Sequence, residues 1–307
     1  MRGTVAADAE TAVRTSEPPH LRMGQRVRDV YAHREILLNL VRKELKVKYA
    51  ASVLGAVWSL LNPLVFLAVF TFVTTVIGNP LPDYPVYLLS GLLAWNLFSV
   101  SLTTGARSVI DNANLVKKMS FAREILPLAA IGVALVDYVL QTGVLLLLVI
   151  AMGYGLHVPE LSLFPLAFLT LLVFTAAMTF WMAALNVRYR DVQHLLNVAL
   201  LVWFWVTPIV YAGALVQEEL AGRELLSVKL FDLYFLNPLA AIVEGMHRAL
   251  YAVVAPAVSE APTPVLVDSS MGWMAAVLAA VLVGSVVLLR LAWGLYFRLS
   301  GDFAEEL

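Results

Sequence analysis

Long apolar stretches are the feature of this sequence that most constrains its fold. A helix that crosses the ~30 Å hydrocarbon layer of a bilayer needs about 20 mostly apolar residues. Six stretches reach that length: Ser52–Gly78, Tyr84–Ile110, Ile125–Gly153, Leu161–Leu185, Leu195–Val216 and Met271–Phe297. Of the 307 residues, 61% are hydrophobic and 14% are charged, against about half and a quarter in soluble domains. The sequence therefore predicts an all-α integral membrane protein with six transmembrane helices.

The distribution of positive charge predicts how these helices are oriented. Cytoplasmic loops of membrane proteins are enriched in Lys and Arg. An even number of spans leaves both ends of the chain on one side, and a cytoplasmic location of that side places 18 of the 21 Lys and Arg residues there. The short outer loops, Asn79–Asp83 and Tyr154–Glu160, contain none. We predict that both termini are cytoplasmic.

The N-terminal region divides into a tail and a helix. Residues 1–24 are mostly polar and lack the apolar core of a signal peptide, so we predict a disordered cytoplasmic tail. Residues 25–51 carry apolar side chains at close to helical period and a basic opposite face, which predicts an amphipathic helix in the headgroup plane. The six-span domain covers residues 52–307. The helix could simply anchor the chain, or its basic residues could meet the phosphate of a lipid substrate where it enters: Arg42, Lys43, Lys46 and Lys48.

The segment Asn112–Glu124 (NANLVKKMSFARE) falls on the cytoplasmic side between spans two and three. It is too apolar for a free loop and too short to cross a bilayer. Two interpretations are open, an interfacial turn on lipid and a helix that docks a cytosolic subunit.

The long outer segment 212–270 contains an apolar part that is interrupted by charge. Intact spanning would bury Glu244, His247 and Arg248, so a re-entrant pair of short helices is favoured over a span. A loop that rests on the membrane is the alternative.

Motifs for catalysis are absent from the sequence. It contains no G-x-x-x-x-G-K-[ST] phosphate loop, no H-E-x-x-H, no G-x-S-x-G and no cysteine. Its five histidines show no metal-ligand spacing. Asp137 is the only carboxylate deep within an expected span, which makes it a functional candidate. We interpret it as structural, hydrogen-bonded inside the helix bundle, and we expect a chain that is not an enzyme.

Several strings resemble a known family when they are taken together and in order. KELKVKYAASVLGAVWSLLNPL (43–64), NANLVKKMSFAREILPL (112–128), NVRYRDVQHLLNVALLVWFWVTPIVY (186–211), LNPLAAIVEGMHRAL (236–250) and FAEEL (303–307) are similar to ABC-type polysaccharide and polyol-phosphate export permeases. That group includes O-antigen, teichoic-acid and galactan exporters. The chain departs from its pattern at Ala50–Ala51, at Ala122 and at Ala212–Gly213.

The resemblance implies a permease that works as a homodimer with two separate ATPase subunits, which bind ATP and Mg²⁺. It implies export of a polyprenyl-pyrophosphate-linked glycan across the bacterial inner membrane. The resemblance also implies that the segment 112–124 is a coupling helix that sits in a groove of the ATPase, and that the outer re-entrant segment forms a gate. The expected docking residues are Asn114, Leu115, Lys117, Lys118, Phe121, Arg123 and Glu124.

Aromatic side chains are candidates for the substrate channel between the two permeases, because sugars offer C–H faces that pack on aromatic rings. Trp and Tyr also gather at membrane interfaces as anchors, so only a subset is expected to face a channel. The candidates are Trp58, Trp95, Phe98, Trp203, Trp205, Tyr211, Tyr234 and Phe235.

Two other functions fit the sequence. One is an ABC permease that exports small hydrophobic compounds, and the other is an ion- or proton-coupled carrier that needs no ATPase. The interface helix, the re-entrant segment and the abundant aromatics favour the polysaccharide exporter.

Overall fold

The computed structural model describes residues 23–50, 55, 57–77, 81, 83–118, 121–153, 158–189, 191–225, 228–251, 265–301 and 303. The helices are α1 Met23–Ala32, α2 Arg34–Tyr49, α3 Val57–Ile77, α4 Tyr84–Asp111, α5 Ala113–Lys118, α6 Ile125–Ala151, α7 Val158–Leu161, α8 Phe164–Arg188, α9 Val192–Val206, α10 Gly213–Leu220, α11 Leu230–Tyr234, α12 Pro238–Leu250 and α13 Met271–Ser300. Strands β1 Glu224–Leu225 and β2 Val228–Lys229 form one antiparallel pair. The fold is otherwise helical, as predicted. Of the predicted tail, residues 1–22 lie outside the described residues.

Within the described residues, five helices are long and apolar enough to cross a membrane: α3, α4, α6, α8 and α13. They coincide with five of the six predicted spans. The remaining segment, Leu195–Val216, forms the 15-residue α9 and a separate short helix α10. At ~1.5 Å per residue, α9 extends about 22 Å, which is less than the hydrocarbon layer.

The sequence explains why α9 ends where it does. Pro208 cannot donate the next helical hydrogen bond, and the residue before a proline is driven towards extended backbone. Thr207 adopts that conformation, with φ −96° and ψ 137°. The carbonyl groups beyond the break accept hydrogen bonds from α4: Tyr84 Oη donates to Val210 O at 3.0 Å and Tyr87 Oη donates to Tyr211 O at 2.7 Å. The broken backbone is therefore satisfied by two buried tyrosines.

Helix α4 is the centre of the bundle, with α6 and α8 packed against it and α13 packed against α8. Close packing of α4 on α8 depends on a glycine. A Cβ placed on Gly105 would lie 2.2 Å from Thr179 Cγ2, so α8 occupies the space that a larger residue would need. Nearby, Asn186 Nδ2 donates to the carbonyl of Ala106 at 2.9 Å.

The predicted amphipathic helix of residues 25–51 is two helices, α1 and α2, which are separated at His33. Part of the apolar face of α2 packs against α6, with Leu40 buried. Gly132 of α6 permits this approach, because its Cβ would lie 2.8 Å from Val41 Cγ2. Helix α2 is thus partly a tertiary element and does not rest on lipid alone.

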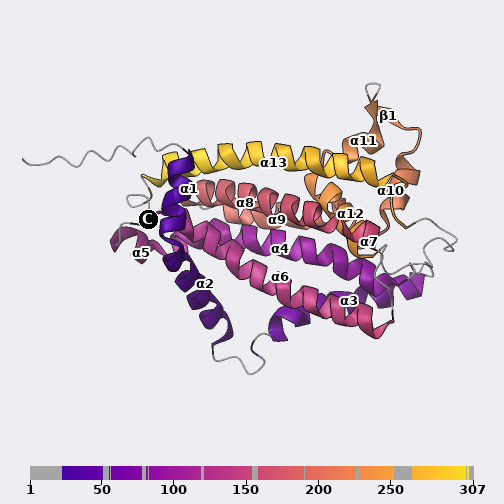
Figure 1. The fold of residues 1–307 in the computed structure, drawn as a ribbon, viewed down its shortest axis with the longest axis horizontal. Coiled ribbons are helices and arrows are strands. Elements are labelled where there is room, and N and C mark those ends of the chain that lie inside the picture. The colour runs from indigo at the N-terminus through magenta and orange to yellow at the C-terminus, as the bar shows by residue number, and fades with distance from the viewer. Residues whose placement is uncertain are drawn as a thin grey trace, which may run out of the picture.

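The two ends of the bundle differ in character (Figure 1). Helices α1 and α5 and the C-terminal end of α13 lie together at one end, and α7, α10, α11 and α12 gather at the other. At the first end the Arg26 guanidinium lies over the Phe297 ring, with Cζ 3.5 Å from the ring centroid. Burial lowers the pKa of Arg26 from its ordinary value. The side of the membrane on which each end lies stays a prediction from the Lys and Arg distribution.

Candidate functional site

A buried carboxylate joins three helices near the middle of α6. Asp137 is 7% exposed. Its Oδ2 lies 2.5 Å from Lys48 Nζ at the end of α2, and its Oδ1 accepts hydrogen bonds from Tyr49 Oη at 2.8 Å and from Ser59 Oγ of α3 at 2.9 Å. A buried charge is tolerated when it is paired and its remaining lone pairs accept hydrogen bonds. Asp137 is therefore hydrogen-bonded inside the bundle, as predicted.

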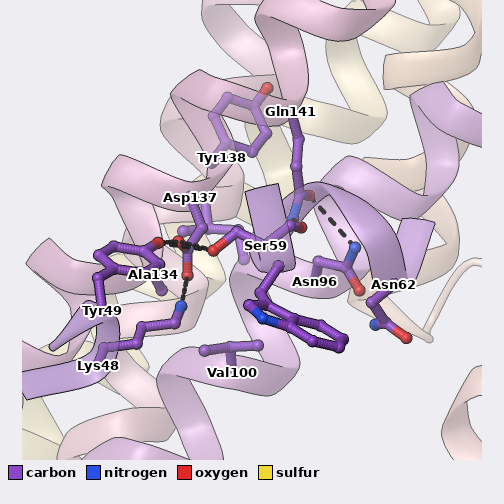
Figure 2. Close-up of a pocket in the computed structure, with 12 residues that line it drawn as sticks. Lys48, Tyr49, Ser59, Asn62, Asn96, Val100, Ala134, Asp137, Tyr138 and Gln141 are labelled. Atoms are coloured by element: carbon purple, nitrogen blue, oxygen red, sulfur yellow. Dashed lines mark hydrogen bonds and ion pairs between the residues drawn. The ribbon is translucent and has the colours of Figure 1, made fainter. Parts of the chain in front are cut away.

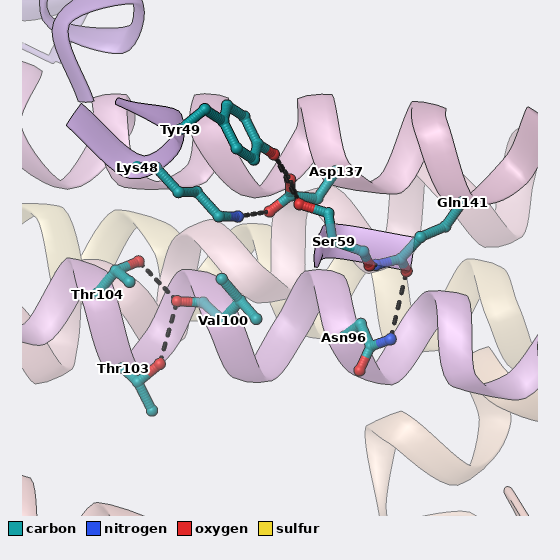
Figure 3. A network of polar contacts seen from close by, with 9 residues as sticks. All are labelled: Lys48, Tyr49, Ser59, Asn96, Val100, Thr103, Thr104, Asp137 and Gln141. Atoms are coloured by element: carbon teal, nitrogen blue, oxygen red, sulfur yellow. Dashed lines mark hydrogen bonds and ion pairs between the residues drawn. The ribbon is translucent and has the colours of Figure 1, made fainter. Parts of the chain in front are cut away.

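Two amides extend this network to α4 (Figure 3). Gln141 Nε2 donates to the backbone carbonyl of Ser59 at 3.0 Å, and Gln141 Oε1 accepts from Asn96 Nδ2 at 3.3 Å. In a regular helix that carbonyl would accept from the amide four residues later, but Pro63 stands there inside α3 and has no N–H. Gln141 therefore satisfies a carbonyl that the proline leaves open in an apolar layer.

The side chains around this network line a pocket of about 310 Å³, which lies between the end of α2 and helices α3, α4 and α6 (Figure 2). The sequence predicted separate roles for Lys48, at a lipid phosphate, and Trp58, in a channel, and the structure brings both into this pocket. The predictions missed Asn62 and Asn96. Both could have been recognised in the sequence, because each is a polar residue inside an apolar span. The polar lining is Lys48, Tyr49, Ser59, Asn62, Asn96, Asp137, Tyr138 and Gln141.

A second cavity, of about 710 Å³, adjoins the polar pocket and shares Lys48 and Val100 with it. It follows α4 towards α5, where Lys43 Nζ donates to Asn112 Oδ1 at 3.4 Å. Of the four basic residues predicted at a lipid phosphate, Lys43 and Lys48 line this cavity. Arg42 and Lys46 are exposed on α2 and line neither cavity. The two cavities extend from the α5 end of α4 to its middle.

The predicted docking segment forms the six-residue helix α5 and the turn before α6, with residues 119 and 120 outside the described residues. Asn114, Lys117 and Lys118 are exposed on it. Leu115 and Phe121 are half-buried against the chain's own apolar cluster.

The end of this segment is tied to α13. Glu124 is 6% exposed and accepts from Trp293 Nε1 at 3.4 Å, while the Arg123 carbonyl accepts from Tyr296 Oη at 2.9 Å. The Arg123 side chain is half-exposed. Glu124 therefore belongs to the internal contact between α6 and α13, whereas the other six predicted docking residues retain exposed surface.

The predicted channel aromatics separate into three groups. Trp58 and Trp205 are 54% and 53% exposed. Trp203, Tyr211 and Tyr234 are half-buried. The others are buried in the chain's own core and present little surface to a channel in this structure: Trp95, Phe98 and Phe235.

At the opposite end, α12 is a short and almost completely buried helix. Its 13 residues are too few to cross a bilayer, which agrees with the expectation of a segment that does not span. Glu244 is 1% exposed and accepts from the Val267 N–H at 2.8 Å. His247 stacks on Tyr87, with ring centroids 3.9 Å apart. The role of α12 as a gate stays a prediction. Among the described residues, no group of three His, Asp or Glu side chains is placed to hold a metal ion.

Comparison with known proteins decides the family. The model of the ABC-2 type transporter family matches residues 36–251, which is most of the chain and includes most of α2, both cavities, α5 and α12. This chain belongs to the ABC-2 type transporter family.

Named relatives of this ABC-2 transporter chain are O-antigen export system permease proteins RfbA. The protein of Myxococcus xanthus is 34% identical over 227 residues, which cover 73% of this chain and 84% of the relative. Two proteins of Klebsiella pneumoniae are 29% and 28% identical over 186 residues, which cover 60% of this chain and 72% of each relative. The resemblance to ABC export permeases found in the sequence is confirmed. The chain is a multi-pass membrane protein and a transport component, and not a catalyst.

Proposed function

We propose that this ABC-2 permease exports a lipid-linked polysaccharide, or a polyol-phosphate polymer, across a bacterial inner membrane. The observation that carries the proposal is the set of polar and charged side chains in the lining of the two adjoining cavities along α4, within helices that are otherwise apolar. These side chains can bond the hydroxyl groups of a sugar polymer, whereas a site for small hydrophobic compounds contains only a small number of polar groups. The names of the relatives in Myxococcus and Klebsiella support the same substrate class.

Energy comes from a separate ATPase in this proposal. The chain has no phosphate-binding loop, so ATP and Mg²⁺ bind to the partner. The ATPase contacts α5 and the turn that follows it on the cytoplasmic side. The exposed polar groups of Asn114, Lys117 and Lys118 supply charge and hydrogen bonds, with Leu115, Phe121 and Arg123 beside them. Glu124 is left out of this surface because it is buried.

A second copy of the chain completes the channel. Helices α3 and α9 expose apolar side chains at helical spacing, and their aromatic members Trp58 and Trp205 are the candidates for a path between two copies. The assembly is then two permeases with two ATPases. The residues of the exposed faces are Leu61, Val65, Val69, Phe72 and Val76 on α3 and Leu195, Val198, Leu201, Val202 and Trp205 on α9.

The lipid phosphate enters beside α2 in this scheme. Lys43 and Lys48 line the larger cavity, and Arg42 and Lys46 lie outside it on the same helix, within reach of headgroups. Basic residues at the membrane surface each attract anionic groups by about 1 kcal/mol.

An apolar groove favours a second candidate function, export of small hydrophobic compounds. The groove measures about 450 Å³ between α8, α13 and the turn that joins α11 to α12, and its lining includes Phe174, Phe235, Val281 and Leu288. It also suits a lipid acyl chain, which is compatible with the first proposal.

Depletion of the chain in the bacterium that makes it distinguishes the two functions. We expect surface polysaccharide to fall and lipid-linked polymer to accumulate on the cytoplasmic side, with retention of hydrophobic dyes unchanged. Normal surface polymer together with increased dye retention would reject the proposal in favour of the second candidate.

A further inference from the structure

The polar pocket beside Asp137 contains two amides with hydrogen-bonding groups that have no partner among the described residues. The Asn62 side chain is exposed and makes no hydrogen bond to the described residues. Asn96 uses its Nδ2 towards Gln141, and its Oδ1 accepts no hydrogen bond from the described residues. Figure 2 shows both amides among the side chains that line the pocket, Asn62 from α3 and Asn96 from α4.

These amides lie within membrane-spanning helices. Asn62 belongs to the candidate span Trp58–Val76, and Asn96 belongs to Tyr84–Asp111. Hydrocarbon offers no hydrogen bonds, so an amide without a partner there is unfavourable unless it meets protein, water or a polar ligand. Polar groups at membrane depth generally face a cavity with a function. The pocket is therefore suited to a polar occupant.

The charge of the pocket favours a neutral occupant over an anionic one. Its charged lining consists of Lys48 and Asp137, which are paired with each other at 2.5 Å. A phosphate would have to compete with the Asp137 carboxylate for the ammonium group. The groups left to bind a ligand are uncharged amides, which suit hydroxyl groups as donors and as acceptors.

One wall of the pocket is aromatic. Trp58 lines it with an indole that is 54% exposed. An aromatic face packs against the C–H face of a sugar ring, while amides beside it bond the hydroxyls at the ring edge. The volume of about 310 Å³ is near the lower end of the ~300–1,000 Å³ range of small-molecule sites. It suits a single ring and not a polymer.

We infer that this pocket binds one neutral sugar ring of the transported glycan, with Trp58 packed on the ring and Asn62 and Asn96 bonded to its hydroxyls. The inference rests on the proposed function and makes it more specific, because it assigns a binding site for the sugar ring. The paired Lys48 and Asp137 hold α2 against this pocket.

Binding of synthetic lipids to the full chain, purified with its ATPase into nanodiscs, tests the inference. The probes are farnesyl pyrophosphate and its glucosyl, galactosyl and N-acetylglucosaminyl derivatives. We expect Asn62→Leu and Trp58→Leu each to raise the Kd of the tightest-binding sugar probe by about fivefold to tenfold. That change corresponds to the loss of roughly one hydrogen bond or ring contact. The Kd of farnesyl pyrophosphate should change by less than about twofold, since that lipid lacks the sugar.

Thr75→Val is the matched control on α3, because the Thr75 hydroxyl donates to the Thr71 carbonyl at 2.7 Å and does not line the pocket. It should leave every Kd unchanged. Asn62→Leu is not expected to impair folding, since the amide it removes has no partner among the described residues.

Three outcomes would overturn the inference. Unchanged Kd values for the sugar-bearing probes in both pocket variants would exclude this pocket as the sugar site. That result would not contradict the exporter function. An equal rise in the Kd of farnesyl pyrophosphate and of its sugar derivatives would indicate that the pocket binds the pyrophosphate and not the sugar. A wild-type complex that binds none of the four lipids would count against the pocket and the proposed function together.

Discussion

At the scale of single residues, the network around Asp137 depends on two features that are locally unfavourable in a membrane helix. One is the carboxylate itself, and the other is Pro63, which leaves the Ser59 carbonyl without its helical donor. Lys48 pairs with the first and Gln141 satisfies the second. Each partner lies on a different helix, so each local defect becomes a tertiary contact.

We expect Asp137→Ala to lower the free energy of unfolding by about 1–3 kcal/mol. Breaking a buried pair costs about 3–5 kcal/mol, and the value is reduced here because the Lys48 side chain is 38% exposed. In a double-mutant cycle with Lys48→Met, measured by thermal unfolding in nanodiscs, the combined loss should be smaller than the sum. Strictly additive losses would show that the pair is not coupled. Asp111→Ala is the control, because its pair with Arg107 is exposed.

Asp137→Asn addresses function at the same position. The remaining amide oxygen can still accept from Tyr49 or Ser59, so we expect export to be largely retained. The measurement is the amount of surface polymer in cells that carry the Asp137→Asn variant, compared with wild type. Complete loss at a normal amount of protein in the membrane would give Asp137 a direct part in transport.

At the scale of elements, the break after α9 is supported from α4. Tyr87→Phe removes the hydroxyl that donates to the Tyr211 carbonyl at 2.7 Å and leaves that partly buried carbonyl without this donor. We expect a loss of about 1–3 kcal/mol in the free energy of unfolding. Tyr31→Phe, on an exposed tyrosine of α1, should change it by less than about 0.5 kcal/mol. Equal melting temperatures of the two variants would argue against this role of Tyr87.

The contact of α4 with α8 gives a steric test. Gly105→Ala places a methyl group 2.2 Å from Thr179 Cγ2, and overpacking of this kind costs about 1–3 kcal/mol. Thr179→Ser removes the clashing methyl and should restore most of the stability, as measured by thermal unfolding. Gly143→Ala, in α6 with no atom within 4 Å of the new Cβ, is the control. A Gly105→Ala variant as stable as this control would contradict the close packing.

At the scale of the whole molecule, the lengths of the apolar stretches predicted most of the fold. A helix that spans a bilayer needs about 20 consecutive, mostly apolar residues, and such a run can be recognised in the sequence without knowing its tertiary contacts. Tertiary partners could not be predicted in this way. The sequence shows Phe98 and Trp58 as similar aromatics in neighbouring spans, yet Phe98 is fully buried and Trp58 is half exposed at a pocket. Burial depends on which helix packs on which face. The apolar pattern alone does not contain that information.

The same limit applies to the docking segment. The resemblance predicted a coupling helix there, but not that Glu124 would face Trp293 inside the bundle. Likewise, the length of the apolar stretch Leu195–Val216 outweighed Pro208 in the prediction of a full span, whereas the proline ends α9.

Charge reversal on α5 tests the proposed contact with the ATPase. The Lys117→Glu and Lys118→Glu double variant changes two exposed residues that lie outside the core, so the protein should fold normally. We expect the ATPase that co-purifies with it to fall at least fivefold. Arg188→Glu, at an exposed position at the end of α8, should keep the wild-type amount. Equal co-purification in both variants would exclude these lysines from the contact.

The most direct test of the central claim is a pull-down of the wild-type chain from its native membrane, with mass spectrometry of the proteins and lipids that accompany it. The exporter account expects a second copy of the chain, an ATPase subunit and a polyprenyl-linked glycan. An ATPase without such a lipid, together with bound small hydrophobic compounds, would contradict the substrate class. Recovery of the chain without any ATPase would contradict the account as a whole.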